Sequence, residues 1–247
     1  MRDIVGKDET LDILCNEELR IIQKKKGYRL SVDAFLLAAF VVLKKHERLL
    51  DIGSGCGIIP IYIAKKGYTN EMIGVELQTD LYDTAQKNRV INHCEGRVHF
   101  INADINTLLG DMKKTPFHVV VSNPPYTKHR SGRTCPERSR FLARYEETLN
   151  LEALVHAASS LLMKKGRFYV IYPARRAGEL IHAAESHKLA LKRLRAVYPR
   201  KDENANLVLA EFTKDGGVGA AIEKPLYVYD GDVISAEVRK YYSFGDK

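Results

Sequence analysis

The chain has 247 residues, of which 45% are hydrophobic, and this is enough to bury the core of one α/β domain. Its 39 Lys and Arg residues outnumber its 31 Asp and Glu residues, and the resulting net charge of +8 favours an acidic partner such as nucleic acid. The four cysteines lie far apart without a CxxC pair, so neither a disulfide framework nor a metal site is expected.

Hydropathy gives no indication of a membrane protein. The longest apolar run covers residues 34–43, which is too short to cross a bilayer. The first twelve residues carry charges of both signs and do not resemble a signal peptide. A cytoplasmic protein without a membrane partner is therefore expected.

The N-terminal lead-in, residues 1–46, is expected to contain a helix that covers one face of a sheet. Ser31 is a suitable N-cap for a helix that extends to Leu43, and Asp33 is favourable in its first turn. A covering helix explains both polar residues, yet it leaves them able to line a ligand site.

A glycine-rich loop follows the first expected strand, residues 48–52. Its sequence, Asp51-Ile-Gly-Ser-Gly-Cys-Gly, lets the backbone turn tightly and approach a ligand, and the next helix points its positive end at that ligand. The spacing is GxGxG, whereas a dinucleotide site would need a further glycine where Ile58 stands. The three glycines are Gly53, Gly55 and Gly57.

Two further expected strands end near acidic residues. Residues 72–75 lead into Glu76, which lies 19 residues beyond Gly57 and is placed to accept hydrogen bonds from two ribose hydroxyls. Residues 98–102 end near Asp104, which can accept from an adenine amine. Acidic residues at successive strand ends after a glycine loop are more specific than any one of them alone.

The segment HVVVSNPPY, residues 118–126, carries the candidate chemistry. Its apolar run predicts a buried strand, and Pro124 and Pro125 then impose a stiff loop at the strand's carboxyl end, where α/β sheets bind ligands. The Asn123 amide oxygen and the Pro124 carbonyl can both accept from an amine, and Tyr126 can stack on a ring. These four residues suit a planar substrate that bears an NH₂ group.

The C-terminal half continues the α/β pattern. An apolar stripe over residues 151–162 predicts a core helix that Gly166 ends, followed by a strand at 167–171. Two further strands are expected near 191–198 and 207–213, with a helix at 179–185 before them. The tail, residues 214–247, is expected to pack as an extension of the sheet edge.

Basic residues gather before the glycine loop, directly after Asn-Pro-Pro-Tyr, and after the strand at 167–171. A positive segment beside a target-amine motif is well placed to hold phosphates. The candidate RNA-binding residues are Lys24, Lys25, Lys26, Arg29, Lys128, Arg130, Arg133, Arg138, Arg140, Arg175 and Arg176.

The order DIGSGCG, VEL, NAD and NPPY, within residues 48–172, resembles the class I S-adenosylmethionine-dependent methyltransferases that methylate amino groups. The resemblance implies an α/β fold with a seven-stranded, Rossmann-like sheet, mostly parallel with an antiparallel last strand, and helices on both faces. It also implies S-adenosyl-L-methionine as the cofactor and no metal. The cofactor-binding residues it implies are Ser31, Asp33, Asp51, Gly53, Gly55, Gly57, Glu76, Leu77, Asp104 and Asn123.

The flanks, residues 21–40, 143–159, 198–214 and 225–232, are similar to bacterial tRNA adenine methyltransferases. This family acts on the 6-amino group of the adenosine next to the anticodon of a valine tRNA. Tyr145 stands where the family has histidine. The resemblance implies tRNA as the partner and one domain over residues 1–247, with a catalytic core at 47–213; a monomer is favoured.

Four alternatives remain at this stage. The first is a methyltransferase that acts on another amino group, in a ribosomal RNA base or in protein glutamine. A protein glutamine methyltransferase shares the NPPY motif, although the lead-in leaves little room for the helical domain such enzymes carry. A DNA adenine methyltransferase would need a larger recognition domain, so DNA is not expected. A non-catalytic cofactor- or RNA-binding module and a nicotinamide-dependent dehydrogenase are the remaining two. Ile58 counts against the dehydrogenase.

Overall fold

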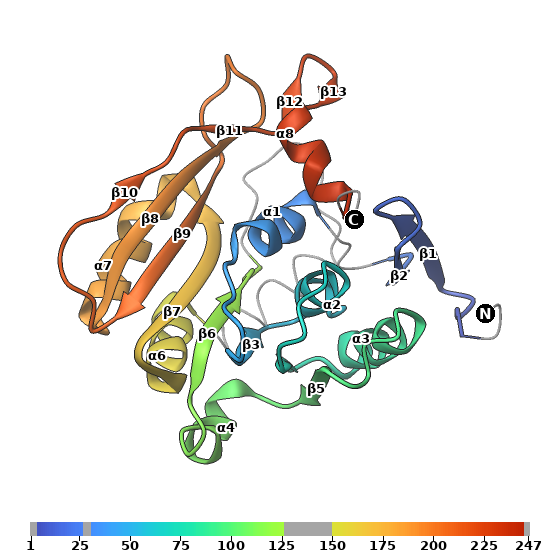
Figure 1. Cartoon of the computed structure of the whole chain (residues 1–247), viewed down its shortest axis with the longest axis horizontal. Helices are drawn as coiled ribbons and strands as arrows, with labels where there is room; N and C mark the ends of the chain where they lie inside the picture. Colours follow the sequence, from blue (N-terminus) through green and yellow to red (C-terminus); the bar gives the residue numbers. More distant parts are fainter. Residues whose placement is uncertain (1–3, 27–30, 126–149, 245–247) are drawn as a thin grey trace.

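A computed structural model describes residues 4–26, 31–125 and 150–244. Its centre is a sheet of nine strands in the order β10-β8-β9-β7-β6-β3-β4-β5, with β11 also paired to β8 (Figure 1). Strands β3 to β8 run parallel, and β9 runs antiparallel to both of its neighbours. The strands expected from the sequence are β3 (Leu49–Ile52), β4 (Met72–Glu76), β5 (Val98–Asn102), β6 (Phe117–Ser122), β7 (Leu162–Pro173), β8 (Leu189–Tyr198) and β9 (Leu207–Lys214).

Helices cover both faces of this sheet, as predicted. One core cluster joins the first three helices to one face, and a second joins α4, α6 and α7 to the other. None of the described helices has the length and hydropathy needed to cross a membrane. The helices are α1 (Val32–Phe40), α2 (Ile58–Lys65), α3 (Thr79–Ile91), α4 (Ile105–Met112), α6 (Leu151–Leu161) and α7 (Ala177–Ser186).

Two predicted helix ends were wrong. The first helix ends at Phe40 and not at Leu43, because Val41 already has extended backbone angles. Helix α6 ends at Leu161, and β7 begins at once, so Gly166 lies inside a strand and does not end the helix. A Cβ on Gly166 would lie 2.9 Å from the Met163 carbonyl oxygen, so this bulged stretch of β7 needs glycine.

The tail extends the sheet edge, as predicted, and raises the strand number above seven. Strands β10 (Ala221–Ile222) and β11 (Leu226–Tyr227) both pair with β8 in parallel. Beyond them, β12 (Tyr229–Asp230) and β13 (Val233–Ile234) form a small hairpin, and α8 (Ala236–Arg239) follows. The chain then returns to the helices, where the Tyr62 hydroxyl donates to the Tyr241 carbonyl over 2.7 Å.

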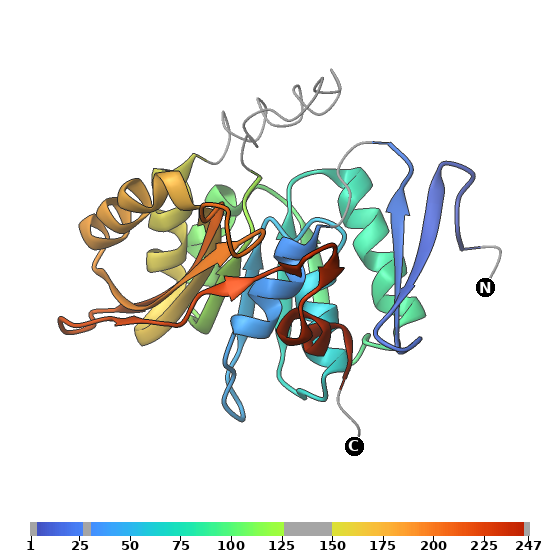
Figure 2. The ribbon, with the colours of Figure 1, turned by 90° about the horizontal axis from the view of Figure 1, so that it is seen from above.

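An N-terminal hairpin was not predicted. Strand β1 (Glu9–Leu14) pairs antiparallel with β2 (Leu19–Lys24), and the pair forms a separate two-stranded sheet. Figure 2 shows this hairpin lying along α3 at the edge of the molecule. Leu19 and Ile21 of β2 join the core cluster that also contains the first three helices of the main sheet, and Ile22 is buried as well.

Glycine is required beneath the glycine-rich loop as well as within it. A Cβ on Gly74 would lie 2.6 Å from Phe100 Cδ1 and 2.9 Å from Ser54 Cβ. We therefore expect Gly74→Ala to lower the free energy of unfolding by about 1–3 kcal/mol, because the ring and the loop must both move. Gly96→Ala, where a Cβ meets nothing within 4 Å, is the control and should change it by less than about 0.5 kcal/mol. Equal urea midpoints for the two variants would contradict this packing.

Candidate active site

A pocket lies where the loops after β3, β4 and β6 meet. Strand β3 pairs with β4 on one side and β6 on the other, so the glycine loop stands between Glu76 and Asn123 at the carboxyl edge of the sheet. Helix α1 closes the pocket with Ala34. The lining residues are Ala34, Gly53, Ser54, Gly55, Cys56, Ile58, Ile59, Glu76, Gln78, Leu81, Asn123 and Pro125.

The glycine loop adopts left-handed backbone conformations that favour glycine. The φ angles of Gly53, Gly55 and Gly57 are 73°, 56° and 81°. The Gly57 N–H donates to the Ser54 carbonyl over 2.9 Å and closes the turn into α2. A Cβ on Gly57 would lie only 2.4 Å from Phe100 Cζ, so this last glycine is also required for packing.

Glu76 supports the loop with its carboxylate. Its Oε2 accepts from the Gly55 N–H over 2.8 Å, and its Oε1 accepts from the Gln78 N–H over 2.9 Å. The residue is only 2% exposed, and this burial raises the pKa of Glu76, although the backbone N–H groups of Gln78 and Gly55 oppose the rise. Each carboxylate oxygen has a further lone pair, so Glu76 can still accept from ribose hydroxyls.

Asp51 is a buried carboxylate without a hydrogen-bond partner in the described part of the chain. It is fully buried, and neither of its oxygens has a hydrogen-bond partner among the residues that the structure describes. Burial, and then the nearby charge of Glu76, raise the pKa of Asp51 well above its ordinary value. The Ser54 hydroxyl beside it also lacks a partner in the described chain. Two buried acids together favour a ligand that brings positive charge and hydrogen-bond donors.

Ser122 fixes the end of β6 against the end of β3. Its buried hydroxyl donates to the Ile52 carbonyl over 2.8 Å, directly before the glycine loop begins. Asn123 is the next residue, and with Pro125 it reaches the pocket lining. The backbone thus places the predicted amine-binding residue beside the predicted cofactor loop. Tyr126 lies outside the described residues.

Six predicted cofactor residues are not among the lining residues, and two of them, Asp51 and Gly57, are described above. Ser31 begins α1 without a side-chain cap, and Asp33 is 4% exposed. Leu77 is 41% exposed, and Asp104 accepts from the Asn106 N–H over 2.9 Å as the N-cap of α4. Their cofactor contacts stay predictions.

Sequence reasoning missed several lining residues. Ser54 lies between two glycines that were named, while Gln78 and Leu81 follow Glu76 into the first turn of α3. The position of Gln78 and Leu81 shortly after Glu76 could have identified them, because a ligand that binds at the end of a strand also contacts the start of the next helix.

Among the residues that the structure describes, no thiol or imidazole near the pocket is arranged for acid–base work. Burial raises the pKa of the Cys56 thiol to about 12, which makes it inert as a nucleophile. The Nδ1 atom of His118 accepts from the Arg48 N–H at the opposite end of β6, a structural role.

Several of the predicted RNA-binding side chains contact other residues of the protein. The Lys24 ammonium lies 2.9 Å from Asp8, and the Lys25 ammonium donates to the Lys7 carbonyl over 2.7 Å. Arg176 pairs with Glu179 over 2.9 Å at the carboxyl end of β7. RNA binding stays a prediction for every residue of this group, and Arg29, Lys128, Arg130, Arg133, Arg138 and Arg140 lie outside the described residues.

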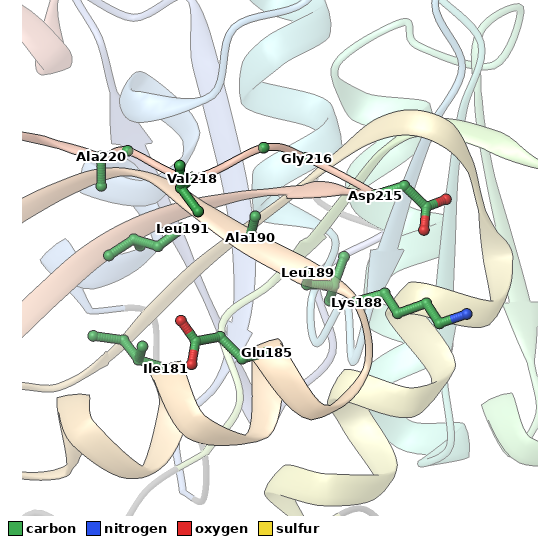
Figure 3. Close-up of a pocket in the computed structure, with 12 residues that line it drawn as sticks. Ile181, Glu185, Lys188, Leu189, Ala190, Leu191, Asp215, Gly216, Val218 and Ala220 are labelled. Atoms are coloured by element: carbon green, nitrogen blue, oxygen red, sulfur yellow. The ribbon is translucent and has the colours of Figure 1, made fainter.

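A second hollow lies away from this site. Figure 3 shows it between α7, the start of β8 and the loop of residues 215–220. Because β8 is parallel to β7, its start lies at the opposite edge of the sheet from the glycine loop. Its lining contains none of the predicted site residues, so we assign it no part in the chemistry.

The fold and the site define an α/β protein whose glycine loop and two buried acids suit a positively charged nucleoside cofactor. The methyltransferase small domain family matches residues 31–184, and the chain belongs to this family. It is an enzyme, a methyltransferase that uses S-adenosyl-L-methionine, and Asp51, Glu76 and the glycine loop fit this cofactor's charge and ribose.

Similar proteins match over most of the chain. A tRNA1(Val) (adenine(37)-N6)-methyltransferase of Photobacterium profundum is 28% identical and covers 85% of this chain and 88% of its own. One of the same name from Porphyromonas gingivalis is 30% identical, covering 81% of this chain and 80% of its own. The crystal structure of a predicted O-methyltransferase from Agrobacterium tumefaciens shares the fold at a TM-score of 0.68, with 20% identity, over 85% of this chain and 95% of its own.

Proposed function

We propose that this enzyme methylates the 6-amino group of an adenosine in tRNA, namely the anticodon-loop adenosine of a valine tRNA. The observation that carries the proposal is that Asn123 and Pro125 line the same pocket as the glycine loop and Glu76. Relatives with the tRNA adenine activity in their names match across at least four fifths of the chain, and the net charge of +8 suits an RNA partner.

Asn123 and Pro124 activate the target amine. The lone pair of an exocyclic amine is delocalised into its ring, so the nitrogen is a poor nucleophile. When the Asn123 oxygen and the Pro124 carbonyl accept its two hydrogens, the nitrogen becomes pyramidal and its lone pair turns out of the ring plane. The remaining requirement is alignment with the methyl group, a matter of proximity and orientation.

Asp51, Glu76 and the glycine loop hold the cofactor, which supplies a methyl group on a positively charged sulfur. Glu76, which supports Gly55, would accept from the ribose hydroxyls, and the buried Asp51 carboxylate would compensate the positive charge of the bound cofactor. The adenosine nitrogen forms a bond to the methyl carbon as the carbon–sulfur bond breaks. The methylated nitrogen then releases one proton to water, so no protein base is required.

Tyr126 and the basic residues recognise the nucleotide and its neighbours. Stacking of an unpaired base on an aromatic ring contributes about 1–3 kcal/mol, and an anticodon-loop adenosine is already outside a duplex. The positive segment that follows Tyr126 binds the phosphates on either side.

Replacing Arg130 and Arg133 together by alanine should weaken tRNA binding and reduce its dependence on salt, because fewer counterions are released. The double variant Lys113→Ala with Lys114→Ala removes the same charge from the turn before β6, at the opposite edge of the sheet. Filter binding across a salt series should show a shallower slope only for the arginine pair. Both pairs should leave S-adenosylhomocysteine affinity unchanged; equal slopes would oppose a phosphate role for the arginines.

The proposed function is tested by methyl transfer from labelled S-adenosyl-L-methionine to bulk bacterial tRNA, followed by nucleoside digestion and mass analysis. We expect 6-methyladenosine as the labelled product. Label in protein glutamine or in ribosomal RNA, with none in tRNA, would overturn the tRNA assignment and keep the amine chemistry of Asn123.

A further inference from the structure

Two buried asparagines, Asn88 on α3 and Asn92 at the C-cap of α3, hold the N-terminal hairpin in the same way. Asn92 accepts from the Arg20 N–H over 3.0 Å and donates to the Arg20 carbonyl over 2.6 Å. Asn88, one turn earlier, accepts from the Ile22 N–H over 2.7 Å and donates to the Ile22 carbonyl over 3.0 Å. Each carboxamide therefore substitutes for a neighbouring strand along the open side of β2.

The third hydrogen bond distinguishes the two asparagines. Asn88 Nδ2 also donates to the Cys56 carbonyl over 2.9 Å, inside the glycine loop. Asn92 Nδ2 donates instead to the Asn88 carbonyl over 2.8 Å, within its own helix. Only Asn88 joins the hairpin to the cofactor loop.

The hairpin fixes which way the Asn88 carboxamide points. Because its oxygen accepts from the Ile22 N–H, its NH₂ group must face the two carbonyls of Ile22 and Cys56. The reversed amide would set its oxygen against two carbonyl oxygens. The side chain is fully buried, so water cannot replace these bonds.

The glycine loop is therefore held at Gly55 and Cys56 from two sides, by Glu76 and by Asn88. The Gly55 N–H donates to Glu76, and the carbonyl of the next residue, Cys56, accepts from Asn88. Left-handed φ angles at Gly55 and Gly57 surround this point, and glycine has many other conformations available. Fixing one N–H and one carbonyl selects the conformation that the pocket needs.

A second contact strengthens the connection between the hairpin and α3. Glu9 of β1 is 5% exposed and accepts from the Lys87 ammonium over 2.9 Å, and Lys87 directly precedes Asn88. Both strands of the hairpin are thus attached to the same turn of α3.

We infer that Asn88 is a positioning residue for cofactor binding, and that through it the N-terminal hairpin is a working part of the cofactor site. The hairpin lies along α3 (Figure 2), and through Asn88 it sets the shape of the glycine loop. This inference requires only that the enzyme binds S-adenosyl-L-methionine, and it holds whether or not tRNA is the substrate.

The test compares Asn88→Ala with Asn92→Ala in the full chain. Each substitution removes three hydrogen bonds, including two to the backbone of β2, so both should lower the melting temperature by similar amounts. Calorimetric titration with S-adenosylhomocysteine should show an increase in Kd of about tenfold or more for Asn88→Ala. The increase should stay below about threefold for Asn92→Ala.

Hydrogen exchange gives a readout that loss of stability alone would not change. Bound S-adenosylhomocysteine should slow amide exchange in residues 19–24 of the wild type and of Asn92→Ala, and this slowing should disappear in Asn88→Ala. If an alanine variant does not fold, the pair Asn88→Ser and Asn92→Ser provides the same comparison with a smaller loss. Equal changes in Kd for the two positions, or an unchanged Kd for the Asn88 variant, would overturn the inference.

Discussion

Asn123→Ala should reduce methyl transfer by about a thousandfold while S-adenosylhomocysteine binds within about twofold of wild type. The amide oxygen is the acceptor that turns the amine lone pair toward the methyl group, so its loss raises the barrier of the chemical step. The cofactor is held mainly by the glycine loop and Glu76, which Asn123→Ala leaves in place. Single-turnover kinetics with saturating cofactor, beside a calorimetric titration, measure the two effects separately.

Asn123→Asp provides the matched control for this prediction. It keeps the side-chain length and an acceptor oxygen, so a measurable part of the transfer rate should return. Wild-type turnover in Asn123→Ala would contradict the role of the amide. An equally inactive aspartate variant with unchanged cofactor affinity would mean that the NH₂ group, and not the oxygen, is what the reaction needs.

Asp51→Asn should have opposite effects on stability and on cofactor binding. The buried carboxylate has no partner in the described chain, so removing its charge should stabilise the cofactor-free protein by roughly 1–3 kcal/mol at neutral pH. The same change removes the charge that faces the cationic cofactor, and Kd for S-adenosyl-L-methionine should rise by about tenfold or more.

The pH dependence of this effect follows from the raised pKa of Asp51. The folded state holds the proton of Asp51 more tightly than the unfolded state. The resulting contribution to the free energy of unfolding is therefore fully present below about pH 4. It is lost as the pH rises through the folded-state pKa. The advantage of Asp51→Asn should therefore be absent in acid and grow toward neutral pH.

Thermal melting of cofactor-free protein over a pH series measures this advantage. A gain of 1 kcal/mol corresponds to a rise of about 2–4 °C in Tm for a chain of this size. Asp202→Asn, in the exposed loop between β8 and β9, is the control for the change in net charge and should shift Tm little. A lower Tm for Asp51→Asn at neutral pH would show that the carboxylate stabilises the apo fold.

The central strands and the glycine loop could be predicted because their signals are local. Apolar runs that end in Asp51, Glu76 or Asn123 carry both the strand and its functional end in a few consecutive residues. The parallel sheet then brings those ends together without further information, since β3 pairs with both β4 and β6.

The N-terminal hairpin could not be predicted because Asn16 is a single and weak turn signal. Cys15, Asn16 and Glu17 all have positive φ angles, and neither glycine nor proline marks the turn. Asn88 escaped notice for a different reason. It appears as one polar residue in a helix, and its partners Ile22 and Cys56 lie 66 and 32 residues away.

The central claim is tested most directly with two transcripts of a valine tRNA that differ only at the adenosine next to the anticodon. One keeps adenosine there, and the other carries guanosine, which has an oxygen in place of the 6-amino group. We predict one methyl group per adenosine transcript, found by mass analysis as 6-methyladenosine at that position, and none on the guanosine transcript. Equal methylation of both transcripts, or of neither, would contradict the proposed substrate.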